Sequence, residues 1–232
     1  LPHQLEAVYN YILPRPNIRF LIADDPGAGK TIMAGLVLKE LKYRKLINRI
    51  LIVSPGHLIY KWMRELKDRF SENFTIVNRQ HLKNYWNQNV WRKDKQILTS
   101  MDFLKQKEIR KLIGNEKWDL IIVDEAHKMS ARLSGTKIEK TQRYLLGEIL
   151  SRNSTHYLFL TATPHRGDIN NFSLFLSLLE PEMFSPSKGF QLDNQIKYLQ
   201  NEENAILIRR LKENMVDFNG NSLFPDRYPN TI

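Results

Sequence analysis

The chain has 232 residues, 42% of them hydrophobic, so it is long enough to bury a core of its own as one large domain or two small ones, and we expect one. Its 35 Lys and Arg against 25 Asp and Glu favour a polyanionic partner such as nucleic acid over an acidic small molecule, although a soluble protein can also simply be basic. The absence of cysteine excludes disulfides and thiolate metal sites, and apolar runs too short to span a bilayer, with no signal peptide at the start, predict a soluble cytoplasmic protein without a membrane partner.

Short apolar runs rich in β-branched and aromatic residues recur along the chain. They cover residues 18–23, 49–54, 74–77, 96–100, 119–124 and 156–161. Continuous apolar runs are typical of strands covered on both faces, and the stretches between them have helical spacing. The pattern predicts an α/β fold with a mainly parallel sheet flanked by helices. Ligands of such sheets bind beyond the carboxyl ends of the strands, so the residues directly after each run matter most.

The composition changes near Ser185. A polar stretch at 185–195 is followed by a helix-like segment at 204–215 and then by residues rich in Gly, Asn and Pro. We therefore expect a main domain over residues 1–185 and a helical extension and linker over residues 186–232.

The first apolar run leads into "DDPGAGKT" (24–31) and then into a helical pattern, which is the context of a phosphate-binding loop. Its glycines let the backbone approach a phosphate chain, Lys30 would reach the outer phosphates, and Thr31 would offer its hydroxyl to Mg²⁺. The nucleotide would lie against Pro26, Gly27, Ala28, Gly29, Lys30 and Thr31. Asp24 stands where the usual pattern has its first glycine, so the loop taken alone could also be a chance glycine turn.

Two carboxylates, Asp24 and Asp25, directly precede this site for a polyanion. A carboxylate about 7 Å from a phosphate costs roughly 0.6 kcal/mol in water. Each charge-assisted N–H bond to the phosphate returns roughly 1.5 to 3 kcal/mol, so several donors outweigh both acids. Asp24 would end the strand, and Asp25 would help the chain to turn with Pro26 fixing φ. Both side chains are expected to point away from the phosphates, where they could hold the shape of the loop.

A second acidic pair, Asp124 and Glu125, follows the run at 119–124. Asp124 would hold Mg²⁺ directly or through a water, and Glu125 would orient or deprotonate the water that attacks the γ-phosphate. A lone acidic pair is more often a solvated turn, but a phosphate loop earlier in the chain favours the catalytic interpretation.

The next run ends in "LTATPHRGD", which places two threonines, Thr161 and Thr163, at a strand end. Their hydroxyls could hydrogen-bond the acidic pair and sense the γ-phosphate. His127 and His165 are expected to be polar couplers between motifs. No carboxylate or second histidine stands near either at ligand spacing, so we predict no zinc site.

Together these segments resemble the first RecA-like lobe of superfamily-two helicase-like ATPases of the Swi/Snf type, over nearly the whole chain. "LPHQLEAV" resembles the glutamine motif, "DDPGAGKT" motif I, "ILIVSPGHLIYKWMREL" motif Ia with Trp62, "ILTSMDFL" motif Ib, "DEAH" motif II, and "LFLTATPHRGDINNFSLFLSLLEPEMF" motif III with the helix after it. The family often has an acid in place of the first glycine of motif I. "ILIRRLKENM" with "LFPDR" resembles the stretch that leads into the second lobe. The bacterial and archaeal branch near RapA and the DISARM helicase is the most similar.

The resemblance implies a P-loop NTPase lobe that uses ATP and Mg²⁺, with Lys30, Asp124 and Glu125 as catalytic residues and Gln4 near the adenine. It implies backbone contacts to duplex DNA at Pro55, Gly56, His57, Thr99 and Ser100. Arg209 and Arg210 would pack at the lobe junction, or simply form a solvated helix face. The second lobe, with the arginine that completes the ATP site, has no counterpart here, so weak nucleotide binding and poor hydrolysis are expected of this segment alone.

Basic residues are frequent between positions 79 and 117. They are Arg79, Lys83, Arg92, Lys93, Lys95, Lys105, Lys107, Arg110, Lys111 and Lys117, and Tyr85, Trp86 and Trp91 interleave with the first of them. They could line a groove that contacts phosphates, or form a solvated face with the aromatic rings turned to the core.

The leading hypothesis is one lobe of an ATP-driven translocase on double-stranded DNA, with the second lobe of the same protein as its partner. Alternatives are a strand-separating RNA or DNA helicase, and a nucleotide-gated DNA-binding module that does not hydrolyse ATP. The long Swi/Snf-like segment after "TATP" argues against the first alternative, and the intact Lys30, Asp124 and Glu125 argue against the second.

Overall fold

The computed structural model describes residues 1–85, 89–134, 137–163, 169–184 and 206–225. A seven-stranded sheet forms its centre, in the order β3-β4-β2-β5-β8-β1-β9, and all strand pairs in it are parallel. The strands are β1 (Arg19–Ile22), β2 (Ile50–Ser54), β3 (Thr75–Ile76), β4 (Gln96–Ser100), β5 (Trp118–Asp124), β8 (Ser154–Leu160) and β9 (Leu207–Ile208). The six predicted strands and the mainly parallel α/β fold are confirmed.

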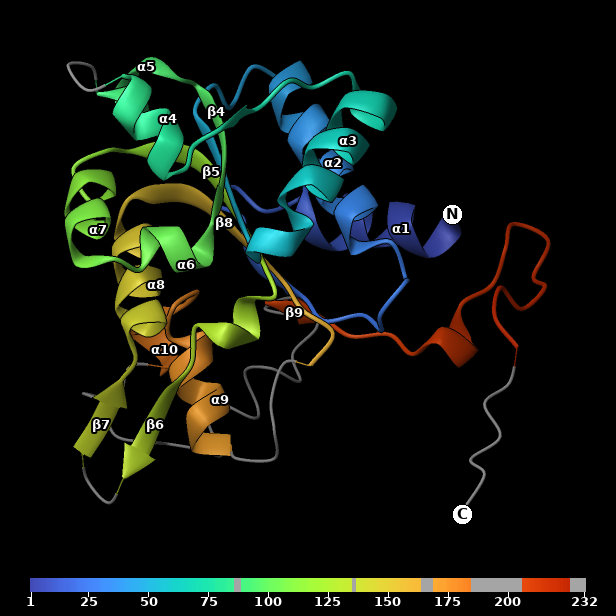
Figure 1. Cartoon of the computed structure of the whole chain (residues 1–232). Coiled ribbons are helices and arrows are strands. Elements are labelled where there is room, and N and C mark those ends of the chain that lie inside the picture. The colour runs from blue at the N-terminus through green and yellow to red at the C-terminus, as the bar shows by residue number, and fades with distance from the viewer. Residues whose placement is uncertain (86–88, 135–136, 164–168, 185–205, 226–232) are drawn as a thin grey trace, which may run out of the picture.

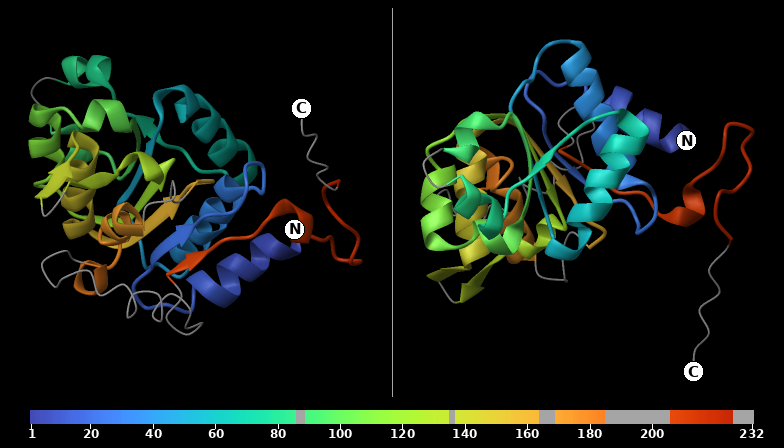
Figure 2. Two further views of the ribbon diagram at one scale, coloured as in Figure 1. Left: turned by 90° about the horizontal axis from the view of Figure 1, so that it is seen from below. Right: turned by 45° about the horizontal axis from the view of Figure 1, so that its top comes forward.

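Helices cover both faces of this sheet (Figures 1 and 2). One face carries α1 (Pro2–Glu6), the π-helix η1 (Ala7–Ile12), α2 (Lys30–Tyr43) and α3 (Ile59–Phe70). The other carries α4 (Arg79–Asn84), α5 (Val90–Lys93), α6 (Met101–Leu104), α7 (Lys107–Ile113), α8 (Gln142–Arg152), α9 (Ile169–Leu176) and α10 (Pro181–Phe184). Short 3-10 helices follow three strands: η2 (Gly56–Leu58), η3 (Ala126–Lys128) and η6 (Lys212–Asn214).

The continuous apolar runs are explained by these two layers of helices. Along β1, Phe20 and Ile22 pack into the core beneath α2 and α3, whereas Leu21 and Ala23 pack into the core on the opposite face. Successive side chains of a strand point to opposite faces, so a strand buried on both faces is apolar at most of its positions. Among the described residues, no helix is both long and apolar enough to cross a membrane.

The segment after the main domain differs from the prediction. A helix was expected over 204–215, but the described part contains the strand β9, which pairs with β1. Leu21 N donates to Ile206 O at 2.8 Å and Ala23 N donates to Ile208 O at 2.8 Å. The edge of β1 offers unpaired backbone groups, and pairing with them outweighs the helical tendency of a short segment.

An antiparallel hairpin, β6 (Ala131–Ser134) with β7 (Lys137–Lys140), was not predicted. Its strands are short and mostly polar, so they lack the apolar run by which the other strands were found. The hairpin lies beside α9, close to the carboxyl edge of the main sheet (Figure 1).

Helices α2 and α3 approach closely at Gly35, where a Cβ atom would lie 2.2 Å from Cε2 of Phe70. We predict that Gly35→Ala lowers the free energy of unfolding by about 1 to 2 kcal/mol, because overpacking exceeds the gain in helix propensity. Urea unfolding measures this, with Gly56→Ala as control, since a Cβ there would meet only Ser100 Cβ at 4.0 Å. Equal stability of the two variants would contradict the prediction.

Candidate nucleotide site

The parallel sheet brings the phosphate loop and the second acidic pair to one edge. Strands β1 and β5 flank β8, so the residues after all three emerge at the same end of the sheet. Burial lowers the pKa of the Lys30 ammonium, and this is opposed by four nearby carboxylates, which belong to Asp24, Glu125, Asp124 and Asp25. Both acidic pairs therefore act on the ammonium of the phosphate loop, as a shared site requires.

Two glycines give the phosphate loop its shape. Gly27 and Gly29 have φ angles of 83° and 84°, in the left-handed region that favours glycine. Gln4 Nε2 donates to Ala28 O at 3.2 Å, and His3 Nε2 lies 3.0 Å from the same oxygen. A Cβ atom on Gly29 would come within 2.2 Å of Gln4 Nε2. The first helix thus braces the loop, and Gln4 lies directly against it.

The side chain of Lys30 lies across the start of the loop. Its Nζ donates to the carbonyl oxygens of Asp24 at 2.6 Å and Asp25 at 3.0 Å. Helix α2 begins at Lys30 with Gly29 as its N-cap, and the half-buried Thr31 occupies its first turn. The free N–H groups of this turn are the donors that an anion at a helix start uses.

Asp24 and Asp25 hold the segment that follows β9, a partner that the sequence did not suggest. The Asp24 side chain is fully buried, and its Oδ1 accepts from Arg210 N at 2.9 Å and Arg210 Nε at 3.3 Å. Its Oδ2 forms an ion pair with Arg210 Nη2 at 2.5 Å. Asp25 Oδ2 accepts from Lys212 N at 3.3 Å. The two acids before the loop therefore anchor the chain that leaves the sheet.

Arg210 also reaches the first helix. Its Nη1 donates to His3 O and lies 3.4 Å from Glu6 Oε2. Figure 2 shows the segment after β9 running beside the N-terminal helices. Of the arginine pair expected at the lobe junction, Arg210 belongs to this network, whereas Arg209 is exposed.

Asp124, at the end of β5, is held by a donor from helix α3. Trp62 Nε1 donates to Asp124 Oδ2 at 2.8 Å, and Glu125 N donates to Asp124 Oδ1 at 2.9 Å. Burial raises the pKa of the Asp124 carboxyl, and the bond from Trp62 opposes this rise. The role of Trp62 was not predicted, although the resemblance singled the residue out.

Glu125 has a left-handed backbone, with φ 51° and ψ 43°, which is uncommon for a residue with a side chain. Strain of this kind is often retained at functional sites. It turns the chain sharply from β5 into η3. Glu125 Oε2 then lies 3.2 Å from His127 Nδ1.

His127 links the acidic pair to the end of β8. Its Nδ1 lies 2.8 Å from Thr161 Oγ1, and the same hydroxyl oxygen accepts from Thr163 N at 3.1 Å. The threonines were expected to hydrogen-bond the acids directly. In the structure Thr161 contacts His127 and His127 contacts Glu125, so the link between Thr161 and Glu125 is indirect. His165 lies outside the described residues.

The residues expected to contact nucleic acid follow the adjacent strands β2 and β4, which pair as far as Ser54 with Ser100. Pro55 is buried, Gly56 and His57 are exposed, and Ser100 is half-buried with its Oγ accepting from Phe103 N at 3.2 Å. The side chain of Thr99 is fully buried and its hydroxyl donates to Val77 O at 2.6 Å. The contact expected at Thr99 stays a prediction.

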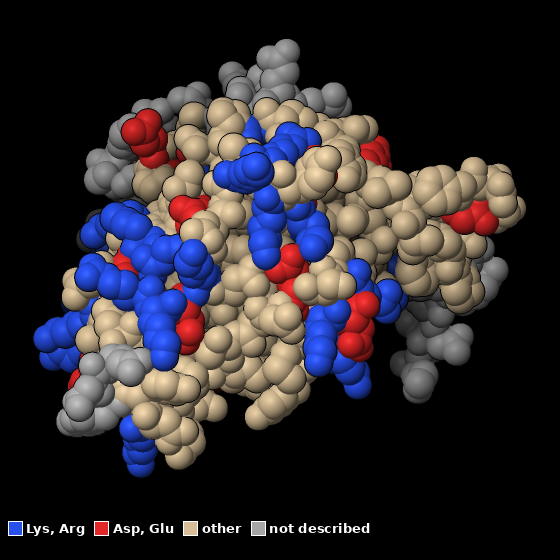
Figure 3. All heavy atoms as spheres, turned by 90° about the horizontal axis from the view of Figure 1, so that it is seen from above, with Lys and Arg blue, Asp and Glu red and all other residues tan. Residues whose placement is uncertain are grey.

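The basic residues between 79 and 117 do not form one surface. Arg92, Lys93 and Lys95 are exposed just before β4, and Lys117 just before β5, at the amino ends of the strands. Figure 3 looks down on this side of the molecule, where many Lys and Arg side chains gather. Arg92, Lys93, Lys95 and Lys117 therefore lie at the edge of the sheet opposite to Gly56 and Ser100. The aromatic residues divide as well, because Trp91 is buried and Tyr85 is exposed, while Trp86 lies outside the described residues.

The sequence matches the family described as SNF2-related domain over residues 3–219. The chain belongs to this family. It is 35% identical over 191 residues to the ATP-dependent helicase YqhH of Bacillus subtilis, covering 82% of this chain and 31% of that protein. It is 31% identical over 204 residues to the RNA polymerase-associated protein RapA of Pasteurella multocida, covering 84% and 20%. The chain thus spans between a fifth and a third of these relatives.

The fold of this SNF2-related chain is also that of a solved SWI2/SNF2 core. The ATPase core of Sulfolobus solfataricus in complex with double-stranded DNA aligns with a TM-score of 0.69 at 19% identity, over 91% of this chain and 44% of that one. The RecA-like fold and the similarity to RapA are therefore confirmed.

For the SNF2-related chain we predict that Arg210→Ala lowers the free energy of unfolding by about 3 kcal/mol or more, because the buried Asp24 carboxylate loses its cation. Urea unfolding measures the loss. The matched control is Arg209→Ala, which removes an exposed arginine one position away and should change stability by less than about 0.5 kcal/mol. Similar effects of both variants would refute the anchoring role of Arg210.

We further predict that Trp62→Phe lowers the free energy of unfolding by about 1 to 3 kcal/mol more than Trp91→Phe does. Both rings are buried and both variants lose the same atoms, but the Trp91 indole N–H has no hydrogen-bond partner among the described residues. A double-mutant cycle with Asp124→Asn should return a coupling energy for Trp62 and none for Trp91. A zero coupling for Trp62 would show that its bond to Asp124 contributes nothing.

Proposed function

We propose that this chain is the ATP-binding lobe of an ATP-dependent translocase on double-stranded DNA, of the Swi/Snf type. The observation that carries the proposal is that the phosphate loop with Lys30 and the acidic pair Asp124 and Glu125 follow the strands on either side of β8, at one edge of the sheet. The names of the relatives, an ATP-dependent helicase and RNA polymerase-associated proteins, support it. So does the similarity in fold to a SWI2/SNF2 core that was solved with double-stranded DNA.

ATP would be bound by residues 26–31, with Lys30 on the outer phosphates and Gln4 beside the adenine. The carboxylate of Asp124 and the hydroxyl of Thr31 are hard oxygen donors of the kind that Mg²⁺ takes together with phosphate oxygens. Both hydrogen bonds to Asp124 come from neutral donors, so neither of them brings a positive charge to the carboxylate. The residues present therefore fit Mg²⁺, which would offset the charge of the phosphates.

Glu125 would position the attacking water and accept its proton. The contact of its carboxylate with His127, and of His127 with Thr161, gives a path by which β8 and the segment after it could respond to the γ-phosphate. Thr163, whose N–H is bonded to the Thr161 hydroxyl, would be the exposed end of this path.

Duplex DNA would be gripped by its backbone at the ends of β2 and β4. Pro55, Gly56, His57 and Ser100 supply backbone groups and short side chains there, which can contact phosphates without reading bases. Trp62 stands on the helix that follows this loop and bonds Asp124, so DNA contact and the Mg²⁺ acid would share one rigid element.

Residues 1–185 would form the body of this lobe, and the lobe would also take in β9. The described residues beyond β9 would lead toward the second lobe, and the greater length of the relatives leaves room for one. That lobe would supply the arginine that completes the ATP site, so this segment alone is expected to hydrolyse ATP poorly.

A strand-separating helicase is the alternative within the same family of motors. Unwinding of a labelled duplex by the full-length protein distinguishes the two, because a translocase would hydrolyse ATP on the duplex without releasing a strand. A nucleotide-gated DNA-binding module is the alternative from another class, and it would show DNA binding that depends on ATP without turnover.

We predict that Glu125→Gln lowers the DNA-stimulated ATPase rate of the full-length protein by about 10² to 10⁴-fold, because the base for the attacking water is lost. Affinity for ATP should be retained, since the amide keeps the shape of the side chain. Glu108→Gln, an equal change on exposed α7, is the control. Should Glu125→Gln hydrolyse ATP as fast as the parent protein, the assignment of the base is wrong.

A further inference from the structure

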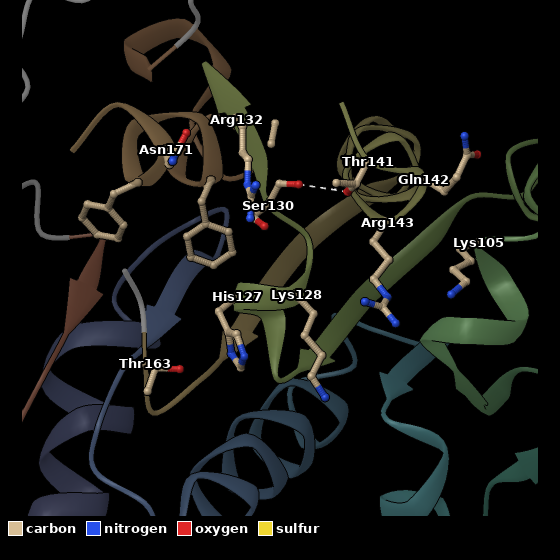
Figure 4. A pocket seen from close by; sticks show the side chains of 13 residues that line it. Lys105, His127, Lys128, Ser130, Arg132, Thr141, Gln142, Arg143, Thr163 and Asn171 are labelled. Carbon is tan, nitrogen blue, oxygen red and sulfur yellow. Dashed lines mark hydrogen bonds between the residues drawn. The ribbon is translucent and has the colours of Figure 1, made fainter. Parts of the chain in front are cut away.

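A hollow opens near the same edge of the sheet, and its lining includes His127 and Thr163 of the candidate nucleotide site (Figure 4). Its volume is about 760 Å³. Its walls come from separate parts of the chain: the end of α6, η3, the hairpin strand β6, the start of α8, and α9. The cations on these walls are Lys105, Lys128, Arg132 and Arg143, and Phe172 and Phe175 supply an aromatic side.

The walls carry an excess of positive charge. No carboxylate belongs to the described lining, and the nearby Asp102 is shared by Lys105 and Arg143, each at 2.7 Å. Within the described ranges, Lys128 and Arg132 form no ion pair. One acid for four cations leaves a field that favours an anionic ligand.

The arrangement of these cations fits an extended anion better than a compact one. They stand on four different elements, and in Figure 4 Lys105, Arg143 and Lys128 follow one another along one wall, with Arg132 farther along. A single phosphate would need them to converge on one point.

The hollow is also continuous with the proposed path of DNA. Lys105 directly follows α6, and the N-cap of α6 is Ser100, one of the proposed backbone contacts. On its other side, Lys128 ends η3, which begins just after Glu125. A phosphate backbone that crosses the end of β4 would reach this hollow next.

We propose that this hollow binds the phosphodiester backbone of the duplex, as an additional contact beyond the loops after β2 and β4. The inference rests on the proposed function and names a further part of its DNA surface. Contacts of Lys and Arg with phosphates carry no sequence information, so the hollow would add affinity and fix the position of the duplex without selecting bases.

The test is duplex affinity of the full-length protein as a function of salt. Lys128→Gln with Arg132→Gln removes the two cations that have no acidic partner. The slope of log K against log salt is negative, and each lost phosphate contact makes it shallower by about 0.9. We therefore expect the slope to become shallower by about 1.8, and binding to be roughly thirtyfold weaker at about 0.15 M salt. The matched control is Lys95→Gln with Lys137→Gln, which removes two exposed lysines outside the hollow and should leave the slope near that of the parent.

A charge-preserving variant, Lys128→Arg with Arg132→Lys, separates charge from packing. It should keep the parental slope, and loss of the slope in this variant too would overturn the proposal. An unchanged slope in the Gln variant, or a loss of ADP affinity measured without DNA, would also overturn it. A parent protein that binds no duplex at all would refute the proposed function itself, whereas duplex binding with an unaltered slope in the Gln variant would refute only this contact.

Discussion

The ion pair between Asp24 and Arg210 is the contact on which the arrangement of this lobe depends. A fully buried carboxylate is tolerated only with a cation and hydrogen bonds around it, and Arg210 supplies both through its backbone and its guanidinium. Because the same guanidinium also bonds His3 O, one side chain joins the first helix, the start of the phosphate loop and the segment after β9. The edge strand β9 is therefore fixed to β1 by a buried charge as well as by backbone pairing, and the chain leaves the sheet in a defined direction.

This pairing also explains why acids can precede a site for a polyanion. An acid that is neutralised by an arginine presents little net charge to a triphosphate, so the repulsion considered for Asp24 is largely cancelled. Asp124 is held in the opposite way, because its partners are an indole N–H and a backbone N–H, both neutral. The fully buried Asp24 and the half-buried Asp124 thus differ in what they can do. Asp24 is paired with a cation within the fold, whereas Asp124 forms no ion pair in the part of the chain that the structure describes.

The sequence predicted those parts of the lobe that depend on local pattern. Strands buried on both faces left continuous apolar runs, and the loop and the acidic pairs stood at the ends of those runs. The partner of Asp24 could not be found in this way, because Arg210 lies 186 positions away and no local signal joins the two. Strand β9 has only two residues, and its stability comes from the edge of β1 rather than from its own composition.

The surplus of ten positive charges raised the expectation of a nucleic-acid partner, but the position of the charges decides what they can do. Strand β5 has seven residues, which at roughly 3.3 Å per residue separates its two ends by about 20 Å. Exposed charges are largely screened beyond about 8 Å at physiological salt, so Lys95 and Lys117 at the amino ends have little effect on an anion at the carboxyl edge. Net charge alone therefore indicates a general attraction to polyanions. Only cations at the carboxyl edge, such as Lys105 and Lys128, stand where they can cooperate with the loops after β2 and β4 in holding a backbone.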